Sequence, residues 1–410
     1  MTIRLQLKKG GVSMFLVVIT CSLVALMVAS FLRLMIRDQQ QVSKHDLSQS
    51  AYDSAQVGIE DAKRFLSIYQ KECAGGFDLT PIKCQKMETE ISKTGAAGSC
   101  NMLHAAGIGA ATGESVVSTR EDDESLNQAY TCVKIHRDTP DYLGKADAGK
   151  AHIIPLKGIQ NFSKVRLSWH TTEDMTNKDR NVWLNTVNYL EDGEEGNHLL
   201  LNRSEWNKKE NVPAILKAQF FGYNQGANGD IYNGLDNDSF AKNGNGLSEQ
   251  IYYPAQGAEA HLEHSLPASR RGDSKALRTN NVSLVRCKED FARTGGLYAC
   301  SVTVKLGHAV QANDIAFLRL TPFYRGANFK LELLDDGNNI VNFRGVQPKV
   351  DSTGRANDQF RRVESRLTFD ENYLPVPDFA VQVEGTETPL CKDFWVSYIK
   401  NSGQAHLECK

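Results

Sequence analysis

The first 80 residues of this 410-residue chain contain no proline, and a 21-residue stretch, 12–32, contains no charged side chain. Without proline nothing interrupts a helix there. As a helix, 21 residues span about 31 Å, close to the hydrocarbon core of a bilayer, about 30 Å. The two absences predict a membrane-spanning helix that continues beyond the membrane. Its span includes Val12, Phe15, Leu16, Val17, Cys21, Ala25 and Leu32.

The sequence also lacks the short motifs of several enzyme classes. It has no Gly-x-Ser-x-Gly elbow, no His-Glu-x-x-His pair and no Cys-x-x-Cys motif, so we expect no enzyme. An excess of positive charge is absent too. The formal net charge is -2, and it becomes -5 without the three basic residues that precede the span. We therefore expect no nucleic-acid partner.

The basic residues before the span set the expected topology. Arg4, Lys8 and Lys9 precede it, so the positive-inside rule keeps the N-terminus in the cytoplasm and places residues 33–410 outside. Three other interpretations compete. A cleaved signal peptide would leave an apolar stub from Phe31 to Ile36, and a lipoprotein would need a small residue before Cys21. An uncleaved signal anchor fits the hydrophobicity alone.

Residues 33–74 continue the helix with a narrow apolar stripe. Its members recur at steps of three and four, the spacing of one helix face. They are Leu47, Ala51, Ala55, Gly58, Ile59, Ala62, Leu66 and Tyr69. The helix is expected to end near Ala74-Gly75-Gly76, a glycine stop signal. Such a stripe needs a folded partner, which the rest of the chain must supply.

The residues from 1 to about 70 resemble the type IV pilin superfamily. Its members carry a short basic leader, a glycine before the cleavage site and a long N-terminal helix packed on an antiparallel sheet. Large PilX-type minor pilins and K-type tip pseudopilins are the most similar. The phrases Phe317–Pro322 and Phe360–Val363 also look like pilin-like proteins of Patescibacteria. The processing region would comprise Lys8, Lys9, Gly10, Gly11 and Val12.

The resemblance implies a partner and a position in a filament. A prepilin peptidase would cut after Gly10 or Gly11, and other pilin subunits would bind the N-terminal helix. Shaft-forming pilins carry a glutamate at the fifth mature position, which pairs with the amine of the preceding subunit. This chain has Phe15 or Leu16 there. A subunit without the carboxylate is expected at the tip, although a non-pilin anchor would lack it as well.

Eight of the nine cysteines lie beyond the span. They are Cys73, Cys84, Cys100, Cys132, Cys287, Cys300, Cys391 and Cys409. Eight cysteines allow 105 pairings, and the sequence alone does not choose among them. We expect sequential pairs, because Cys287 and Cys300 flank a hairpin pattern and Cys391 and Cys409 close a C-terminal loop. Buried reduced thiols are the alternative. The last pair also resembles the disulfide-bounded region of pilins.

The remaining chain is expected to contain a loop-rich cap over 75–150, a β-rich head over 151–390 and a Cys-bounded loop over 391–410. Strands are expected where β-branched and aromatic residues alternate with polar ones. These segments are 165–169, 215–221, 282–287, 297–306, 315–321, 329–334, 340–343 and 360–369. Asp336-Gly337 predicts a tight turn between two of them.

Other conspicuous residues carry weaker hypotheses. Asp230, Asp236 and Asp238 lie in a glycine- and asparagine-rich stretch and are calcium candidates, because calcium prefers oxygen ligands. An Arg-Gly-Asp tripeptide at 271–273 and the pair His261 and His264 are more simply surface residues. Four tryptophans could form a glycan platform, but packing is the simpler role. They are Trp169, Trp183, Trp206 and Trp395.

The sequence thus predicts an α+β protein with a long N-terminal helix, membrane-spanning in its first half, packed on a large and mainly antiparallel sheet. The expected function is that of a minor pilin or tip pseudopilin, which crosses the cytoplasmic membrane once and reaches a pilus or the cell surface. A surface or host-cell ligand would bind the head. The alternative is an extracellular adhesin or binding protein on an uncleaved signal anchor.

Overall fold

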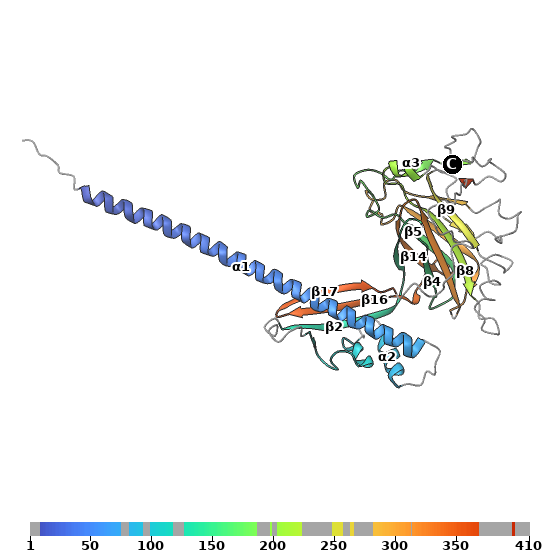
Figure 1. Ribbon diagram of the computed structural model, residues 1–410, viewed down its shortest axis with the longest axis horizontal. Coiled ribbons are helices and arrows are strands. Elements are labelled where there is room, and N and C mark those ends of the chain that lie inside the picture. Colours follow the sequence, from blue (N-terminus) through green and yellow to red (C-terminus); the bar gives the residue numbers. More distant parts are fainter. Residues whose placement is uncertain are drawn as a thin grey trace, which may run out of the picture. The chain divides into compact units, whose positions relative to one another are not determined.

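The computed structural model describes residues 9–74, 82–92, 99–117, 127–186, 197–198, 203–223, 248–256, 263–265, 282–312, 314–368 and 396–397. One long N-terminal helix and large, mainly antiparallel sheets give it the predicted α+β architecture (Figure 1). The chain forms two compact units. Unit 1 comprises residues 1–135 and 350–365, and unit 2 comprises residues 136–349 and 366–410.

The helices are α1 (Lys9–Tyr69), its π-helical end η1 (Gln70–Ala74), α2 (Ile82–Ser92), the short 3-10 helix η3 (Met102–Ala106) and α3 (Arg203–Lys208). The strands are β1 (Ser115–Val116), β2 (Gln128–Thr139), β3 (Tyr142–Ala146), β4 (His152–Leu156), β5 (Phe162–Trp169), β6 (Asn185–Thr186), β7 (Asn197–His198), β8 (Ile215–Tyr223), β9 (Ser248–Gln256), β10 (Glu263–Ser265), β11 (Val282–Arg286), β12 (Cys300–Val310), β13 (Ile315–Phe323), β14 (Ala327–Leu334), β15 (Ile340–Val341), β16 (Phe343–Ala356), β17 (Gln359–Arg366) and β18 (Val396–Ser397).

Unit 1 is built around α1, which lies across β2, β16 and β17 (Figure 1). Those strands belong to a four-stranded sheet of order β1-β2-β16-β17. The predicted stripe is the face of α1 that the unit buries: Ala51, Ala55, Gly58, Ile59, Ala62 and Leu66 are all buried. Leu47 and Tyr69, at its two ends, are half-buried, and Phe65 adds a large buried ring that the periodicity did not single out.

The backbones of α1 and β16 approach each other closely at Gly354. A Cβ at this glycine would lie 2.2 Å from the Ala51 carbonyl oxygen and 2.3 Å from the Ala55 nitrogen. On the facing side, a Cβ at Gly58 of α1 would lie 2.3 Å from Ser352 Oγ and 2.9 Å from a methyl of Val133. Only hydrogen fits at both places, so the two glycines set how deeply the helix sits on the sheet.

Polar contacts and disulfides fix the same helix at other points. The Tyr130 hydroxyl donates to Asp61 at 3.0 Å, and burial, the largest cause, raises the pKa of this tyrosine. Arg361 of β17 donates to the Ser48 hydroxyl at 2.6 Å. Cys73 of η1 is joined to Cys84 of α2, and Cys100 to Cys132 of β2. The C-terminal half of α1 is therefore held along its length.

Two six-stranded sheets share one hydrophobic core in unit 2. Their orders are β10-β12-β5-β14-β15, with β3 added beside β14, and β11-β9-β8-β13-β4, with β6 added beside β9. Leu167 of β5 and Leu331 of β14 lie in the same buried cluster as Leu216 of β8 and Leu318 of β13. The Trp169 indole donates to the Ala214 carbonyl at 2.9 Å. This arrangement is the sandwich-like head that the many predicted strands indicate.

Two local features of unit 2 follow the sequence closely. β14 and β15 form an antiparallel pair, and the turn between them is closed by Asp335 and Asn339, with the Asn339 backbone N–H donating to the Asp335 carboxylate at 2.8 Å. Cys287 and Cys300 form a disulfide and a β-bridge. The three disulfides join cysteines that are neighbours in the sequence, the pairing that we expected. Cys391 and Cys409 lie outside the described residues.

The division of the chain differs from the expected one. The supposed loop-rich cap, 75–150, contains α2, η3 and the strands β1, β2 and β3. In β2 the buried Val133 and Ile135 alternate with less buried residues, which is the period-two pattern of a strand with one buried face. Residues 350–365 fall in unit 1, not in one head over 151–390. Strand β12 also begins at Cys300, later than the predicted start at residue 297.

Gly354→Ala should destabilise unit 1, because the added methyl meets the α1 backbone, which cannot move aside as a flexible side chain would. We expect the free energy of unfolding to fall by about 2 to 4 kcal/mol. Gly107→Ala is the matched control: its Cβ would meet nothing within 4 Å, although its φ is +78°. That variant should lose about 1 kcal/mol. Denaturant unfolding of both variants tests the difference, and equal losses would contradict the close approach.

A buried histidine makes the stability of unit 2 depend on pH. His170 is buried at positive φ, and burial, reinforced by Arg325, lowers its pKa from 6.5 to about 4. The unfolded chain takes up a proton below pH 6.5, whereas the folded chain does so only near pH 4. The free energy of unfolding is therefore not reduced by His170 above pH 6.5. It should fall by about 3 kcal/mol on acidification to pH 4.

Urea unfolding at several pH values measures this dependence. His170→Asn is the control, because asparagine tolerates positive φ and does not titrate. The stability of this variant should change less between pH 6.5 and pH 4 than that of the wild type. Equal slopes in the two proteins would show that other groups cause the dependence.

Candidate functional site

The N-terminal half of α1 is the most unusual surface of the described chain. Every described side chain from 14 to 46 is exposed, and most of those before residue 37 are apolar. Phe31 is 74% exposed, whereas Phe65 on the same helix is 0% exposed. Soluble proteins rarely expose so continuous an apolar surface. It requires an environment or a partner that covers it.

The exposed half has the length and composition of a membrane span. Among the described residues α1 is the one helix long and apolar enough to cross a membrane. Its hydroxyl groups are satisfied within the helix: Thr20 donates to Val17 at 2.9 Å, and Ser22 and Ser30 each donate four residues back at 2.8 Å. Such internal bonds let polar side chains enter an apolar environment at low cost.

One side of this half is hollowed by small side chains. The residues that line the hollow are Thr20, Cys21, Val24, Ala25, Val28, Ala29 and Leu32. Small residues at steps of four allow two helices to approach closely within a membrane. Cys21 lies in this hollow as a free, exposed thiol, in contrast to the six described cysteines beyond the span. The hollow therefore fits the close approach of another helix.

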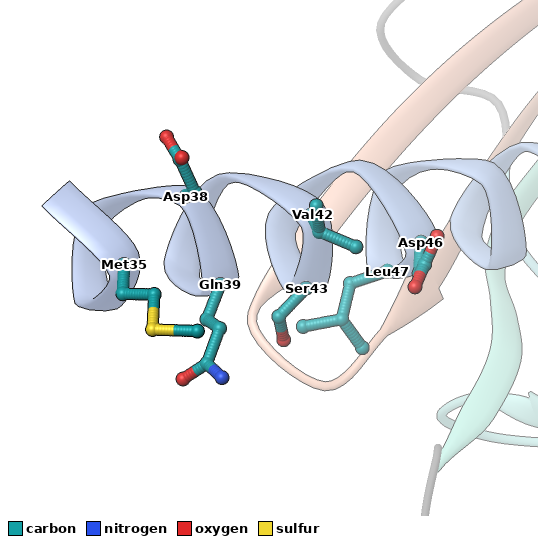
Figure 2. Close-up of a pocket in the computed structure, with 7 residues that line it drawn as sticks. All are labelled: Met35, Asp38, Gln39, Val42, Ser43, Asp46 and Leu47. Atoms are coloured by element: carbon teal, nitrogen blue, oxygen red, sulfur yellow. The ribbon is translucent and has the colours of Figure 1, made fainter.

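A second hollow marks the transition between the exposed apolar half and the part packed on the sheet. It is lined by Met35, Asp38, Gln39, Val42, Ser43, Asp46 and Leu47 (Figure 2). All seven residues belong to α1, so the hollow is a groove along one side of the helix. Unlike the first hollow it contains charge, from Asp38 and Asp46. Helical spacing alone places these two carboxylates within about 80° of each other around α1 and about 12 Å apart along its axis, an arrangement that the sequence-based expectations did not include.

The predicted processing residues lie at the beginning of α1. The helix starts at Lys9 and includes Gly10, Gly11 and Val12, whereas Lys8 lies outside the described residues. The predicted span residues follow in the exposed half: Phe15, Leu16, Val17, Cys21, Ala25 and Leu32. The structure brings them together as one continuous helical surface.

Most of the weaker candidates lie outside the described residues. These are Asp230, Asp236, Asp238, His261, the tripeptide at 271–273 and Trp395. Among the described residues no group of three or more His, Cys, Asp or Glu side chains could hold a metal ion. Trp169 and Trp206 are buried, and Trp183 is half-buried with Lys209 Nζ 5.3 Å from its ring centre. These three tryptophans pack against other side chains.

One glycine motif has the spacing of a phosphate-binding loop. Gly144 to Lys150 reads Gly-x-x-x-x-Gly-Lys, but Ala151 follows where that motif needs Ser or Thr. The segment also joins strand β3 to strand β4, whereas a phosphate-binding loop leads from a strand into a helix. A Cβ at Gly144 would clash with the ring of Phe329 at 2.4 Å, so this glycine serves packing.

Comparisons of the chain with protein families, curated proteins and solved structures find no match.

The exposed half of α1 should be dispensable for folding. No described side chain before Leu47 is buried, so deletion of residues 1–35 should leave a water-soluble protein whose Tm changes by no more than about 2 °C from that of the detergent-solubilised full chain. Deletion of residues 1–55 is the control, since it also removes the buried Ala51 and Ala55. Circular dichroism and size-exclusion chromatography compare them. Unfolding of the shorter deletion would show that the exposed half supports unit 1.

Proposed function

We propose that this chain is a minor pilin or tip pseudopilin of a type IV pilus or a type II secretion-like filament. Its role is assembly rather than catalysis: α1 enters the membrane and then the filament, and the exported β-rich part initiates assembly and contacts a surface. Its partners are prepilin peptidase and other pilin subunits. The cytoplasmic membrane is its first location, and the pilus or cell surface is its last.

The observation that carries the proposal is the division of one continuous helix into two halves. In α1 the apolar half is exposed along its whole length. The other half packs on a four-stranded sheet through a buried stripe of small residues. An ordinary signal anchor needs only the first half. A helix that continues unbroken into the fold transmits position and orientation from the membrane to the exported units, which is what a filament subunit requires.

Charge around the span supports the orientation. Lys8 and Lys9 precede the apolar half, and the disulfide-bonded units follow it. Basic residues remain on the cytoplasmic side, and stable disulfides form in oxidising compartments outside the cytoplasm. Both tendencies favour a helix with its N-terminus inside and units 1 and 2 outside.

The missing carboxylate supports a place at the tip. Whether the leader ends at Gly10 or Gly11, the fifth residue after the cut is Phe15 or Leu16, and both are exposed on α1. A carboxylate in lipid is costly unless it is paired. A subunit with no subunit ahead of it has no amine to pair with, so an apolar residue at this position suits the first subunit of a filament.

The same residue also suits the second candidate function. A membrane-anchored extracellular adhesin or binding protein needs no carboxylate in its span either. In that case α1 would keep its leader and never leave the membrane, and the head would bind its ligand at the cell surface. The fate of the leader separates the two functions.

N-terminal peptide mass spectrometry on the chain from its native membrane and from the sheared surface fraction tests the proposal. We expect a mature protein that begins at Gly11 or Val12 and carries one added methyl group. An intact leader in both fractions would show an uncleaved signal anchor and would favour the anchored adhesin over the filament subunit. A start near Phe31 would show that the span is only an export signal.

A further inference from the structure

Two buried polar side chains on neighbouring strands of unit 2 lack a hydrogen-bond partner in the described part of the chain. Gln250 of β9 is 0% exposed, and Ser283 of β11 is 3% exposed. Neither amide atom of Gln250 bonds to a described residue, and neither does the Ser283 hydroxyl. Buried polar atoms in proteins are nearly always bonded, because an unbonded one loses its hydration without compensation. These three atoms therefore need a partner from outside the chain.

The strand register places both side chains toward the core of the sandwich. Gln250 lies opposite Ala218 of β8, and Ser283 lies opposite Tyr252 of β9. Residues that lie directly opposite each other point to the same face of a sheet. Ala218 and Tyr252 both belong to the cluster buried between the two six-stranded sheets. Figure 1 shows β8 and β9 side by side in unit 2. The unbonded atoms are thus inside the head.

The two side chains are neighbours across a diagonal. Tyr252, which faces Ser283, is two residues after Gln250, or about 7 Å along the strand, and adjacent strands are about 4.8 Å apart. The Cα atoms of Gln250 and Ser283 are therefore about 8 Å apart. Since a serine hydroxyl extends one bond beyond Cβ, this diagonal is long for a direct bond. It leaves a distance that one small bridging molecule can span.

Other buried amides and serines of unit 2 are bonded within the protein. The Asn211 amide, 0% exposed, donates to the Asn177 carbonyl at 2.6 Å. The hydroxyl of the buried Ser168 lies 2.9 Å from that of Ser301. The fold of this unit therefore supplies protein partners for such groups where strands and loops bring them close. At Gln250 and Ser283 the described chain supplies none.

The surroundings of the pair determine what kind of molecule fits. Leu216, Ala218 and Val285 on the same face are apolar. Burial raises the pKa of Tyr252, so its hydroxyl stays neutral. A charged molecule would lose its hydration here without a counter-charge, so the bound molecule must be neutral. The glutamine amide donates through Nε2 and accepts through Oε1, so its partner must both accept and donate.

We propose that Gln250 and Ser283 form an internal binding site for one small neutral molecule that donates and accepts hydrogen bonds and bridges β9 to β11. An ordered water has this chemistry, and so does a small organic molecule with a hydroxyl or amide group. Buried waters typically make about three hydrogen bonds, which is the number of atoms that the two side chains offer. The site does not depend on the proposed filament role, and its failure would leave that role untouched.

Thermal unfolding of the detergent-solubilised full chain tests the site through the sign of a change. Gln250→Met and Ser283→Ala remove the polar atoms and nearly preserve the shape of each side chain. If a molecule bridges them, each replacement breaks its bonds and lowers the Tm by about 2 to 4 °C. If the atoms are truly unbonded, an apolar replacement removes a cost and raises the Tm. A rise in both variants would overturn the proposal.

Ser168→Ala is the matched control. It makes the same change at a buried serine of unit 2 whose hydroxyl has a protein partner, Ser301. Its Tm should fall, and the size of the fall measures what a bonded hydroxyl contributes in this unit. We expect Ser283→Ala to lose a similar amount. A fall for Ser168→Ala beside a rise for Ser283→Ala would show that Ser283 has no partner.

The double variant tests whether one molecule serves both side chains. Losses at two positions about 8 Å apart that share no partner add. A shared ligand is already lost in either single variant, so Gln250→Met/Ser283→Ala should lose clearly less than the sum of the two. Additive losses would overturn the single bridging molecule.

Native mass spectrometry of the full chain identifies the source of the molecule. A one-to-one organic adduct that both single variants lack would indicate a small organic ligand. Falls in Tm without any adduct would indicate water, and both of these results support the site. An adduct that both variants retain, together with an unchanged Tm, would show that binding occurs elsewhere and would overturn the assignment.

Discussion

The approach of α1 to β16 is the constraint on which unit 1 depends. A Cβ at Gly354 would lie 2.2 Å from the backbone of α1, so the helix can sit at this depth only because a glycine faces its alanines. At this depth Asp61 reaches Tyr130 at 3.0 Å, and Ser48 reaches Arg361 at 2.6 Å. A bulkier residue would lift the helix and loosen these contacts together, because all of them lie along one rigid rod.

Rigidity has a consequence for the exposed half. A flexible tether could fold its apolar residues back onto the protein, but α1 is one helix from Lys9 to Tyr69, about 90 Å long. Its first half therefore cannot be covered by the unit that holds its second half. Whatever covers this surface must therefore lie outside unit 1. The close packing at Gly354 thus determines, through the continuity of the helix, that the protein depends on its surroundings.

Local patterns predicted the elements that carry their own signal. The absence of proline and the recurrence from Ala51 to Leu66 predicted α1, and Asp336-Gly337 predicted the turn between β14 and β15. The sequence did not predict β16 beyond Phe343, and the reason is physical. Where α1 lies closest to it, the strand carries Ser352 and Gly354 in place of large β-branched residues. The sequence pattern of a strand is therefore weakest where β16 contacts the helix. Unit 1 joins residues 350–365 to residues 1–135. Local sequence patterns do not contain information about contacts between segments so far apart in the chain.

The two parts of the exposed half are suited to different tasks. Apolar burial is strong but has no direction, so the segment from Met14 to Ile36 can hold the helix in a membrane or a bundle at many rotations and axial positions. Charges of opposite sign at fixed spacings are weak individually but select one rotation and one register, because every other arrangement places like charges together. Among the described side chains of α1, the charges that form neither an ion pair nor a hydrogen bond lie between Arg33 and Asp46, at the end of the apolar surface. If another helix packs beside α1, these few residues would therefore select its rotation and register, while the long apolar segment before them would supply most of the affinity.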